Sequence, residues 1–317
     1  MTSSMPLLQI NAGPQGPELH GASRPLGHAL ADGLETPGPI IIMVHGFKFA
    51  PGDAFDCPHR HILALEPARD CWKAMSWPRA LGFGSGFEDE GLALAFGWSA
   101  RGTIWQAYNR AEGAGHALAA LIRQLRQAAP DRPVHLLTHS LGARVALSAL
   151  PHLAEGDVGR AILLNPAEFG GRARAALATP AGCGAEIYNV TSRENDVFDF
   201  LLERLIAPPH RGDGTLAQTM PRQPNTLTLQ LDHPGTLKAL NAHGFPVAPP
   251  RGRICHWSSY LRPGVFSLYR TLLRRPETLS QARLRSILPD RPDPRWSRVL
   301  QLPEFRVPLP VRRNASP

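Results

Sequence analysis

Short apolar runs of strand length recur along this chain, separated by segments with helical or turn character. The run PIIIMV at residues 39–44 is continuous, rich in β-branched side chains and too short for a buried helix. Comparable runs occupy residues 92–98, 134–139, 160–165 and 186–192. Helix-like segments alternate with these runs. We therefore predict an α/β fold with a doubly wound, mostly parallel sheet and helices on both faces.

Helical spacing is clearest in residues 104–129. The apolar side chains there recur at intervals of three and four residues, and Pro130 and Pro133 end the pattern. The other predicted elements are helices at residues 197–206 and 264–275, an edge strand near residues 6–10, and strands at 226–232 and 253–257.

The length and composition fit one large domain. With 317 residues, of which 43% are hydrophobic and 19% charged, the chain can bury a substantial core. We predict one α/β domain over residues 1–275, in which residues 48–90 form a long loop or cap over a site. Residues 276–317 form a proline- and arginine-rich extension. Its apolar residues indicate that it packs along the domain: Trp296, Leu300, Leu302 and Phe305.

Positive charge is concentrated at the C-terminus. Six units of the net charge of +8 come from the ten arginines and four acidic residues between Arg274 and Pro317. The rest of the chain is therefore close to neutral, which argues against nucleic-acid binding. A weak peripheral contact of the basic extension with an anionic membrane is the partner that this charge would allow.

Compartment signals favour the cytoplasm. The N-terminus has neither the basic nor the apolar region of a secretory signal, and no apolar run reaches the length of about 18 residues that spans a membrane. The four cysteines form no CxxC pair, and free thiols are typical of a reducing compartment. We therefore expect a cytoplasmic protein.

The stretch VHLLTHSLG at residues 134–142 raises the question of a nucleophile. A nucleophile elbow holds a serine on a sharp turn between a strand and a helix, usually as Gly-x-Ser-x-Gly. Ser140 and Gly142 fit this pattern, whereas Thr138 stands where the first glycine is usual. Ser140 is therefore a candidate nucleophile, and an ordinary helix N-cap is its alternative role.

His45, Gly46 and Phe47 follow the first buried run. Acyl transfer requires two backbone N–H groups that point at the developing oxyanion. Leu141, the residue after the candidate nucleophile, would supply one of them. Phe47 would supply the other, because Gly46 lets the backbone approach closely. A simple strand-ending turn with a buried histidine is the alternative.

An acid and a histidine would complete such a site, in the chain order serine, acid, histidine. We expect the acid after the strand at 186–192 and choose Asp196, with Glu194 and Asp199 as alternatives. Spacing alone leaves the base open among the histidines that follow: His210, His233, His243 and His256. We expect His139 to pack beside the elbow and to point away from the nucleophile, because successive strand residues face opposite sides.

A cluster of potential metal ligands lies in residues 53–61. Zinc binds residue types such as these: Asp53, Asp56, Cys57, His59 and His61. The proline after Cys57 and the single-residue spacing of the histidines match no compact zinc motif. We therefore predict no metal site and expect a structured loop over the candidate active site.

The segments VHGFK, THSLGAR, NVTSREND and CHWSSY together resemble the α/β-hydrolase superfamily over roughly residues 39–270. They are similar in particular to bacterial serine-hydrolase and lipase-like branches. The resemblance implies Ser140 as nucleophile, Asp196 as orienting acid and His256 as base. It also implies backbone oxyanion donors at Phe47 and Leu141, supported by the neighbouring residues His45, Gly46, Thr138, His139 and Gly142.

The activity that this resemblance implies is hydrolysis of a small-molecule carboxylic ester or thioester. It would proceed through an acyl-enzyme and needs neither a metal nor a cofactor. The same fold hosts many functions, so the alternative hypothesis is a binding or scaffold protein whose serine is unreactive.

Overall fold

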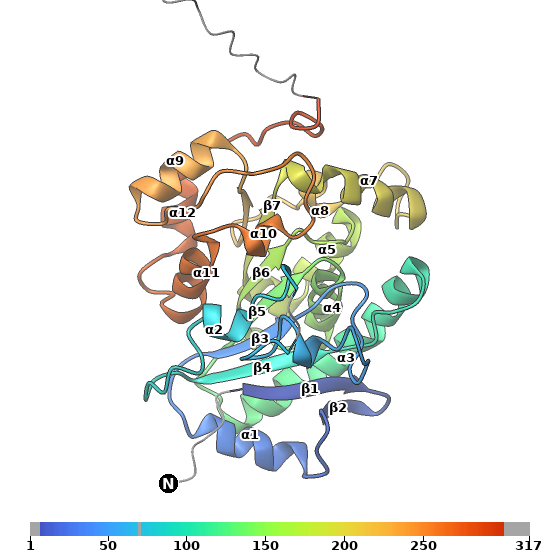
Figure 1. Cartoon of the computed structure of the whole chain (residues 1–317), viewed down its shortest axis with the longest axis vertical. Coiled ribbons are helices and arrows are strands. Elements are labelled where there is room, and N and C mark those ends of the chain that lie inside the picture. The colour runs from blue at the N-terminus through green and yellow to red at the C-terminus, as the bar shows by residue number, and fades with distance from the viewer. Residues whose placement is uncertain (1–6, 69–70, 301–317) are drawn as a thin grey trace, which may run out of the picture.

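The computed structural model describes residues 7–68 and 71–300, which are built around one eight-stranded sheet (Figure 1). The strand order is β2-β1-β4-β3-β5-β6-β7-β8. The strands are β1 (Leu7–Gly13), β2 (Gly16–Leu19), β3 (Ile40–Val44), β4 (Leu92–Gly97), β5 (Val134–His139), β6 (Val158–Leu164), β7 (Glu186–Thr191) and β8 (Thr226–Gln230). β1 and β2 pair antiparallel, and all other neighbours in the sheet are parallel. The predicted doubly wound, mostly parallel sheet is thus confirmed.

Helices cover both faces of this sheet (Figure 1). In chain order they are α1 (Leu26–Leu34), α2 (Trp77–Ala80), α3 (Ile104–Ala128), α4 (Leu141–Ala149), α5 (Gly170–Leu177), α6 (Pro180–Gly184), α7 (Asp196–Leu205), α8 (Leu216–Thr219), α9 (Pro234–Ala242), α10 (Ser258–Leu261), α11 (Val265–Arg274) and α12 (Gln281–Ile287). Short 3₁₀ turns occur at η1 (Pro58–Arg60), η2 (Leu150–His152) and η3 (Arg193–Asn195).

The two faces of β3 explain its uninterrupted apolar sequence. Ile40, Ile42 and Val44 belong to the core shared with α1, α3 and α4. Ile41 and Met43 belong to the opposite core, shared with α2 and α11. Side chains of a strand alternate between faces, so a central parallel strand covered on both sides is apolar at every position.

The strand order reverses beside β3, because β4 lies on one side of it and β5 on the other. In doubly wound sheets, ligands bind at the carboxyl ends of the strands next to such a reversal. The segments that leave β3, β5, β6 and β7 therefore meet at one edge of the sheet, and the candidate site lies there.

Two strand predictions differ from the structure. β1 is not the edge strand, because a turn after Gly13 returns the chain as β2, and Gly16 adopts a positive φ of 129° there. Residues 253–257 form no strand: β8 ends the sheet, and Cys255 donates its N–H to the carbonyl of Glu194 in a loop contact (2.8 Å). Pro6, the first residue of the predicted edge strand, lies outside the described residues.

The C-terminal extension packs on the domain as far as the structure describes it. Leu279 and Leu284 are buried in the core that they share with α11. Arg160 of β6 binds the carbonyls of Pro276 and Leu279, each at 3.0 Å. The ring of Trp296 meets that of Phe200 edge-on, at a centroid distance of 5.7 Å. Leu302 and Phe305 lie outside the described residues.

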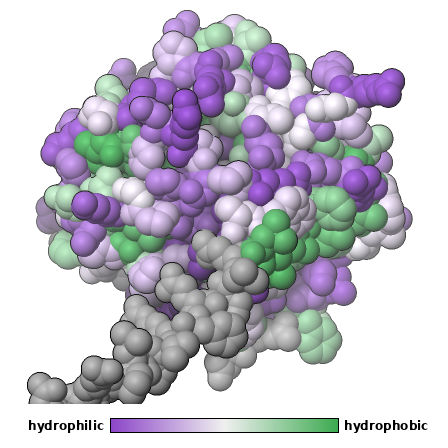
Figure 2. All heavy atoms as spheres, turned by 90° about the horizontal axis from the view of Figure 1, so that it is seen from above, coloured by the Kyte–Doolittle hydropathy of each residue, from purple (hydrophilic) through white to green (hydrophobic). Residues whose placement is uncertain are grey.

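The face of the molecule seen from above is mainly polar (Figure 2). No helix among residues 7–68 and 71–300 is both long and apolar enough to cross a membrane. Figure 2 looks onto the top of the molecule as drawn in Figure 1 and shows mainly hydrophilic side chains with small hydrophobic groups between them. Exposed hydrophobic side chains include Leu201 and Leu205 of α7, which border the cavity described below.

Candidate active site

Ser140 lies between β5 and α4 in a strained backbone conformation, with φ 55° and ψ −123°. Positive φ is unusual for a residue other than glycine, and structures hold such strain mostly at functional sites. The turn is fixed by its own backbone. The Ser140 N–H donates to the carbonyl of Leu164, and its carbonyl accepts from Ala143 and Ala167, each at 3.0 Å. The chain thus makes the sharp turn that presents a serine at an elbow.

Two glycines make this turn sterically possible. A Cβ on Gly142 would lie 2.6 Å from the carbonyl oxygen of Val44, and one on Gly46 would lie 2.7 Å from the Cβ of Ser140. Neither neighbour is the end of a flexible side chain that could move aside. The close approach of α4 and of the segment after β3 to Ser140 therefore requires glycine at both positions.

Thr138 is accommodated by the sheet in place of the usual glycine. It is fully buried in β5, in register with Val44 of β3 and Leu163 of β6. Its hydroxyl lies 3.5 Å from the carbonyl oxygen of Ile162, at the long limit of a hydrogen bond. The β-branched side chain thus packs within the sheet and leaves the turn at Ser140 intact.

Replacing Gly142 with alanine is expected to destabilise the protein by roughly 1–3 kcal/mol, because the new methyl group would overlap backbone carbonyls. The matched control is Gly113→Ala on the exposed side of α3, where an added Cβ meets nothing within 4 Å. Alanine should stabilise that position by about 0.5–1 kcal/mol. Urea denaturation of both variants checks this, and equal effects would contradict the steric explanation.

Phe47 and Leu141 border the cavity beside Ser140 with their backbone amides unused. Leu141 is the first residue of α4, where the N–H groups have no acceptor within the helix. Among the described residues, neither amide has a hydrogen-bond acceptor. The positive end of the α4 dipole adds to the attraction that this position exerts on negative charge. The pair can therefore stabilise an oxyanion formed at Ser140.

His45 fixes the peptide that carries the Phe47 N–H. Its Nε2 accepts from the N–H of Trp98 (3.0 Å), so Nδ1 carries the proton and donates to the carbonyl of Gly46 (2.9 Å). Burial lowers the pKa of His45 to about 4, which keeps the ring neutral. The C=O and N–H of a trans peptide point in opposite directions, so this bond turns the Phe47 N–H away from His45.

His256 lines the same cavity as Ser140 and is held from several sides. Its carbonyl accepts from Nδ2 of Asn165 (2.8 Å) and Nε2 of His139 (3.1 Å). Its ring stacks on Phe198 at a centroid distance of 4.7 Å. His139 therefore faces the cavity, contrary to the expectation that it points away, and contacts the backbone of His256. Asn165 was not among the residues that the sequence pattern indicated.

The imidazole of His256 is oriented by Asn195 and not by Asp196. Nδ1 of His256 lies 2.6 Å from Oδ1 of Asn195, so the ring donates its Nδ1 proton to the amide oxygen. Asn195 directly precedes α7, and successive helical residues diverge by about 100°, whereas residues four apart share a face. Asp199 therefore lies on the same helix face as Asn195, and both residues line the cavity. Asp196 does not line it.

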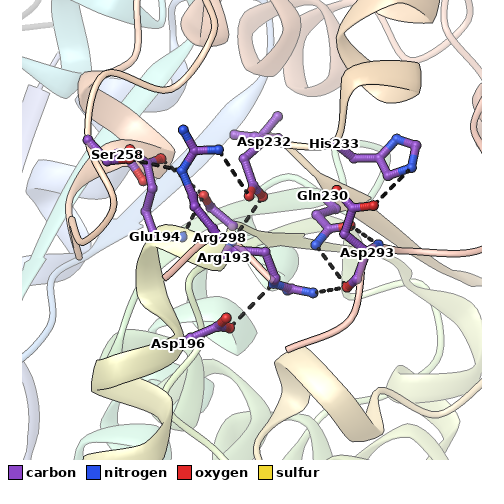
Figure 3. A network of polar contacts seen from close by, with 12 residues as sticks. Arg193, Glu194, Asp196, Gln230, Asp232, His233, Ser258, Asp293 and Arg298 are labelled. Atoms are coloured by element: carbon purple, nitrogen blue, oxygen red, sulfur yellow. Dashed lines mark hydrogen bonds and ion pairs between the residues drawn. The ribbon is translucent and has the colours of Figure 1, made fainter. Parts of the chain in front are cut away.

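Asp196 belongs to a separate polar network (Figure 3). Its Oδ1 pairs with Arg193 at 3.3 Å, and its Oδ2 accepts from the N–H of Trp296 at 2.7 Å. Arg193 in turn donates to the carbonyl of Asp293 (2.6 Å). Asp196 thus anchors the C-terminal extension. Nothing in the sequence pattern distinguished it from Asn195, because the side chain that faces His256 depends on where α7 begins.

Glu194 and the alternative base candidates lie outside the cavity, whereas Asp199, the other alternative acid, lines it. Glu194 forms a buried ion pair with Arg262. The remaining histidines do not line the cavity: His210 is exposed, His233 caps α9 by accepting from the Thr236 N–H (3.2 Å), and His243 contacts the carbonyl of Ala239 (2.9 Å).

Burial controls the protonation of the site. Burial, with repulsion from His139 and Lys73, holds the pKa of His256 well below 6.5, so its ring is neutral at neutral pH. Burial also raises the pKa of Asp199 to about 7. The negative Asp196 contributes to this increase in pKa, whereas Arg295, the Asn195 amide and Arg193 act in the opposite direction. The site therefore offers a neutral imidazole and a carboxyl group that titrates near neutrality.

The cavity has a volume of about 570 Å³ and is mainly apolar. α7 contributes one wall, and the segment 48–90 contributes another. The apolar side chains that line it are Phe47, Phe49, Ile62, Ile104, Leu141, Ala167, Phe198, Leu201, Leu202, Leu205, Trp257 and Tyr260. Within residues 7–68 and 71–300, no three His, Cys, Asp or Glu side chains gather as metal ligands would. In the segment 53–61, Nε2 of His59 instead lies 2.8 Å from Oδ1 of Asn11.

Comparison with known families agrees with the fold. Residues 28–166 match the model of a family described as alpha/beta hydrolase of unknown function (DUF900). The match runs from α1 to the end of β6 and includes Gly46, Phe47 and Ser140. A comparison with curated proteins found no match. The sheet topology and the family match together confirm the resemblance to the α/β-hydrolase superfamily and support hydrolase activity in general.

Proposed function

We propose that the protein is a serine hydrolase that cleaves a carboxylic ester or thioester through an acyl-enzyme. The observation that carries this proposal is the convergence at one cavity of a strained serine, a neutral imidazole with a fixed tautomer and two unused backbone amides. Such a combination matches the requirements of nucleophilic acyl transfer.

In the first step, Nε2 of His256 removes the proton from Ser140 while Oγ attacks the carbonyl carbon. The amides of Phe47 and Leu141 stabilise the negative oxygen that forms. His256 then returns the proton to the leaving alcohol or thiol, and the acyl group remains on Ser140. In the second step, water attacks the acyl-enzyme with the same proton transfers and releases the acid. Among the described residues the Ser140 hydroxyl has no hydrogen-bond partner, so its bond to His256 would form with substrate present.

Asn195 takes the orienting role in this proposal. A neutral amide oxygen fixes the Nδ1–H tautomer as a carboxylate would, as asparagine does in Cys-His-Asn proteases. The Asn195 amide stabilises the imidazolium less than a carboxylate would, because the amide carries no charge. Asp199 lies beside the Asn195 amide, so its negative charge would polarise that amide and partly compensate.

Labelling with a fluorophosphonate tests the proposal directly. This reagent forms a covalent adduct with activated serines. We expect one adduct per chain, which peptide mapping should locate at Ser140. A p-nitrophenyl ester series from acetate to palmitate would then show which acyl chains the apolar cavity accepts. A folded protein that forms no adduct would favour the alternative, a non-catalytic binding protein.

The pH dependence should have two components. Protonation of Asp199, whose pKa is about 7, should lower kcat/KM by roughly threefold as the pH falls through 7, because the neutral acid polarises Asn195 less. Complete loss should occur only well below pH 6.5, where His256 becomes protonated. A pH–rate profile checks both components. Asp199→Asn should remove only the threefold step near pH 7. A complete loss of kcat/KM near pH 7 that persists in this variant would contradict the roles given to Asp199 and His256.

We further propose a cytoplasmic location, which the four free cysteines support. Weak contact of the basic extension with an anionic membrane is a less favoured proposal. In the described part of the extension, Arg295 pairs with Glu203, and Arg285 and Arg298 bind backbone carbonyls. A membrane would have to compete with these partners within the protein.

A further inference from the structure

Lysine is rare in this chain, and two of its three lysines line the cavity. Lys48 follows the oxyanion segment after β3, and Lys73 lies in the segment before α2. The third, Lys238, is exposed on α9 and does not line the cavity. The apolar cavity therefore carries two ammonium groups close to the proposed reaction centre.

Neither cavity ammonium has a counter-charge within the described residues. No carboxylate of residues 7–68 or 71–300 lies within ion-pair distance of Lys48 or Lys73. The two carboxylates that line the cavity are engaged with other groups: Asp56 faces Arg101 at 3.4 Å, and Asp199 lies beside the Asn195 amide. Within residues 7–68 and 71–300, the cavity thus presents positive charge that no carboxylate pairs with.

Lys73 is held at a defined position beside the base. Its Nζ lies 3.4 Å from the ring centroid of Trp257 and 5.1 Å from that of Trp72. These contacts fix the ammonium through cation–π attraction but leave its charge in place. The same charge opposes protonation of His256. A cation beside a base that must become an imidazolium is unfavourable unless a ligand supplies negative charge.

We propose that the substrate carries an anionic acid group, a carboxylate or a phosphate, in its leaving group, and that this group binds Lys73. This inference rests on the proposed function. His256 protonates the leaving alcohol or thiol, so the leaving group lies on the side of His256 and its neighbour Trp257, over which Lys73 is placed. Lys48 directly follows Phe47, the proposed oxyanion donor, and adds to the attraction for anions.

The anion would serve binding and catalysis together. An ion pair in a partly buried cavity is stronger than one in water. Once neutralised by substrate, Lys73 would no longer oppose the imidazolium that forms when His256 accepts the Ser140 proton. Anionic substrates should therefore be favoured in both affinity and turnover.

Binding measurements test whether Lys73 selects anionic ligands, without relying on turnover. The probes are 3-acetoxybenzoate and 3-acetoxybenzamide, which differ in charge but hardly in shape, titrated calorimetrically into the Ser140→Ala protein. We expect about tenfold tighter binding of the carboxylate, declining with added salt. Adding Lys73→Gln should abolish this preference, Lys73→Arg should retain it, and the matched control Lys238→Gln should leave it intact. Equal binding of the two probes, or a preference that survives Lys73→Gln, would overturn the inference.

Kinetics on the Ser140-containing protein give the second readout. Lys73→Gln should lower kcat/KM for 3-acetoxybenzoate and raise it for 3-acetoxybenzamide, because the neutral ester no longer meets an uncompensated cation. Comparing kcat/KM for 3-acetoxyphenyl phosphate with that for 3-acetoxybenzoate shows whether a phosphate or a carboxylate is preferred. A proportional loss on both esters would mean a merely structural role and would overturn the inference. If no ester is cleaved and Ser140 forms no adduct, the proposed function fails, and the binding preference still decides the inference.

Discussion

Replacing Ser140 with alanine should reduce kcat/KM by at least about 10⁴-fold on any ester that the protein hydrolyses, because the variant can form no acyl-enzyme. The fold should be retained. Ser140 is held by backbone contacts, and alanine fits the same turn without a larger side chain. Steady-state kinetics on the best p-nitrophenyl ester would measure the loss.

The control for this experiment is Ser148→Ala in the same helix, α4. Ser148 does not line the cavity, so its hydroxyl should be dispensable for turnover. Circular dichroism and thermal denaturation of both variants would exclude unfolding as the cause. Turnover that survives Ser140→Ala would show that another residue is the nucleophile.

The second large effect is expected at Asn195. Asn195→Ala should lower kcat by roughly 10²- to 10⁴-fold, because the His256 ring loses the acceptor that fixes its tautomer. Asn195→Asp should restore much of the activity at high pH. The new carboxylate would lie beside Asp199, and the repulsion between them should shift the acid side of the pH–rate profile upward. A structural role alone would not produce this shift.

Asp196→Asn is the matched comparison at the neighbouring position. The variant keeps an oxygen that can accept from the Trp296 N–H, and it replaces no residue that lines the cavity. The pKa of Asp199 should fall, because the charge of Asp196 raises it. We expect kcat/KM of the folded variant within about threefold of the wild type, with a clear loss of thermal stability because the buried Arg193 loses its counter-charge. The reverse result, a large loss for Asp196→Asn and a small one for Asn195→Ala, would restore Asp196 as the orienting acid.

Much of the fold could be predicted because the signals are local. A strand buried on both faces has to be apolar throughout, as residues 39–44 are. A strand that ends just before a serine, with a glycine two residues after that serine and a helix beyond, predicts a turn at Ser140. The helix over residues 104–129 corresponds to α3 within one residue at its C-terminal end. By contrast, the nine-residue helix α1 was not predicted, and the loop around Cys255 resembles a strand only in composition.

The sequence by itself determined the sheet, the position of the elbow and the types of residue available for acyl transfer, because these depend on periodicity and on steric limits along a short stretch of chain. Only the tertiary structure decided which neighbour in the sequence REND faces His256, which histidine reaches the cavity, and that Lys48 and Lys73 line it. These outcomes depend on the phase of α7 relative to β7 and on contacts between segments more than 60 residues apart, such as Asn195 with His256. A one-residue change in the helix phase rotates a side chain by about 100°, and no local pattern in the sequence fixes that phase.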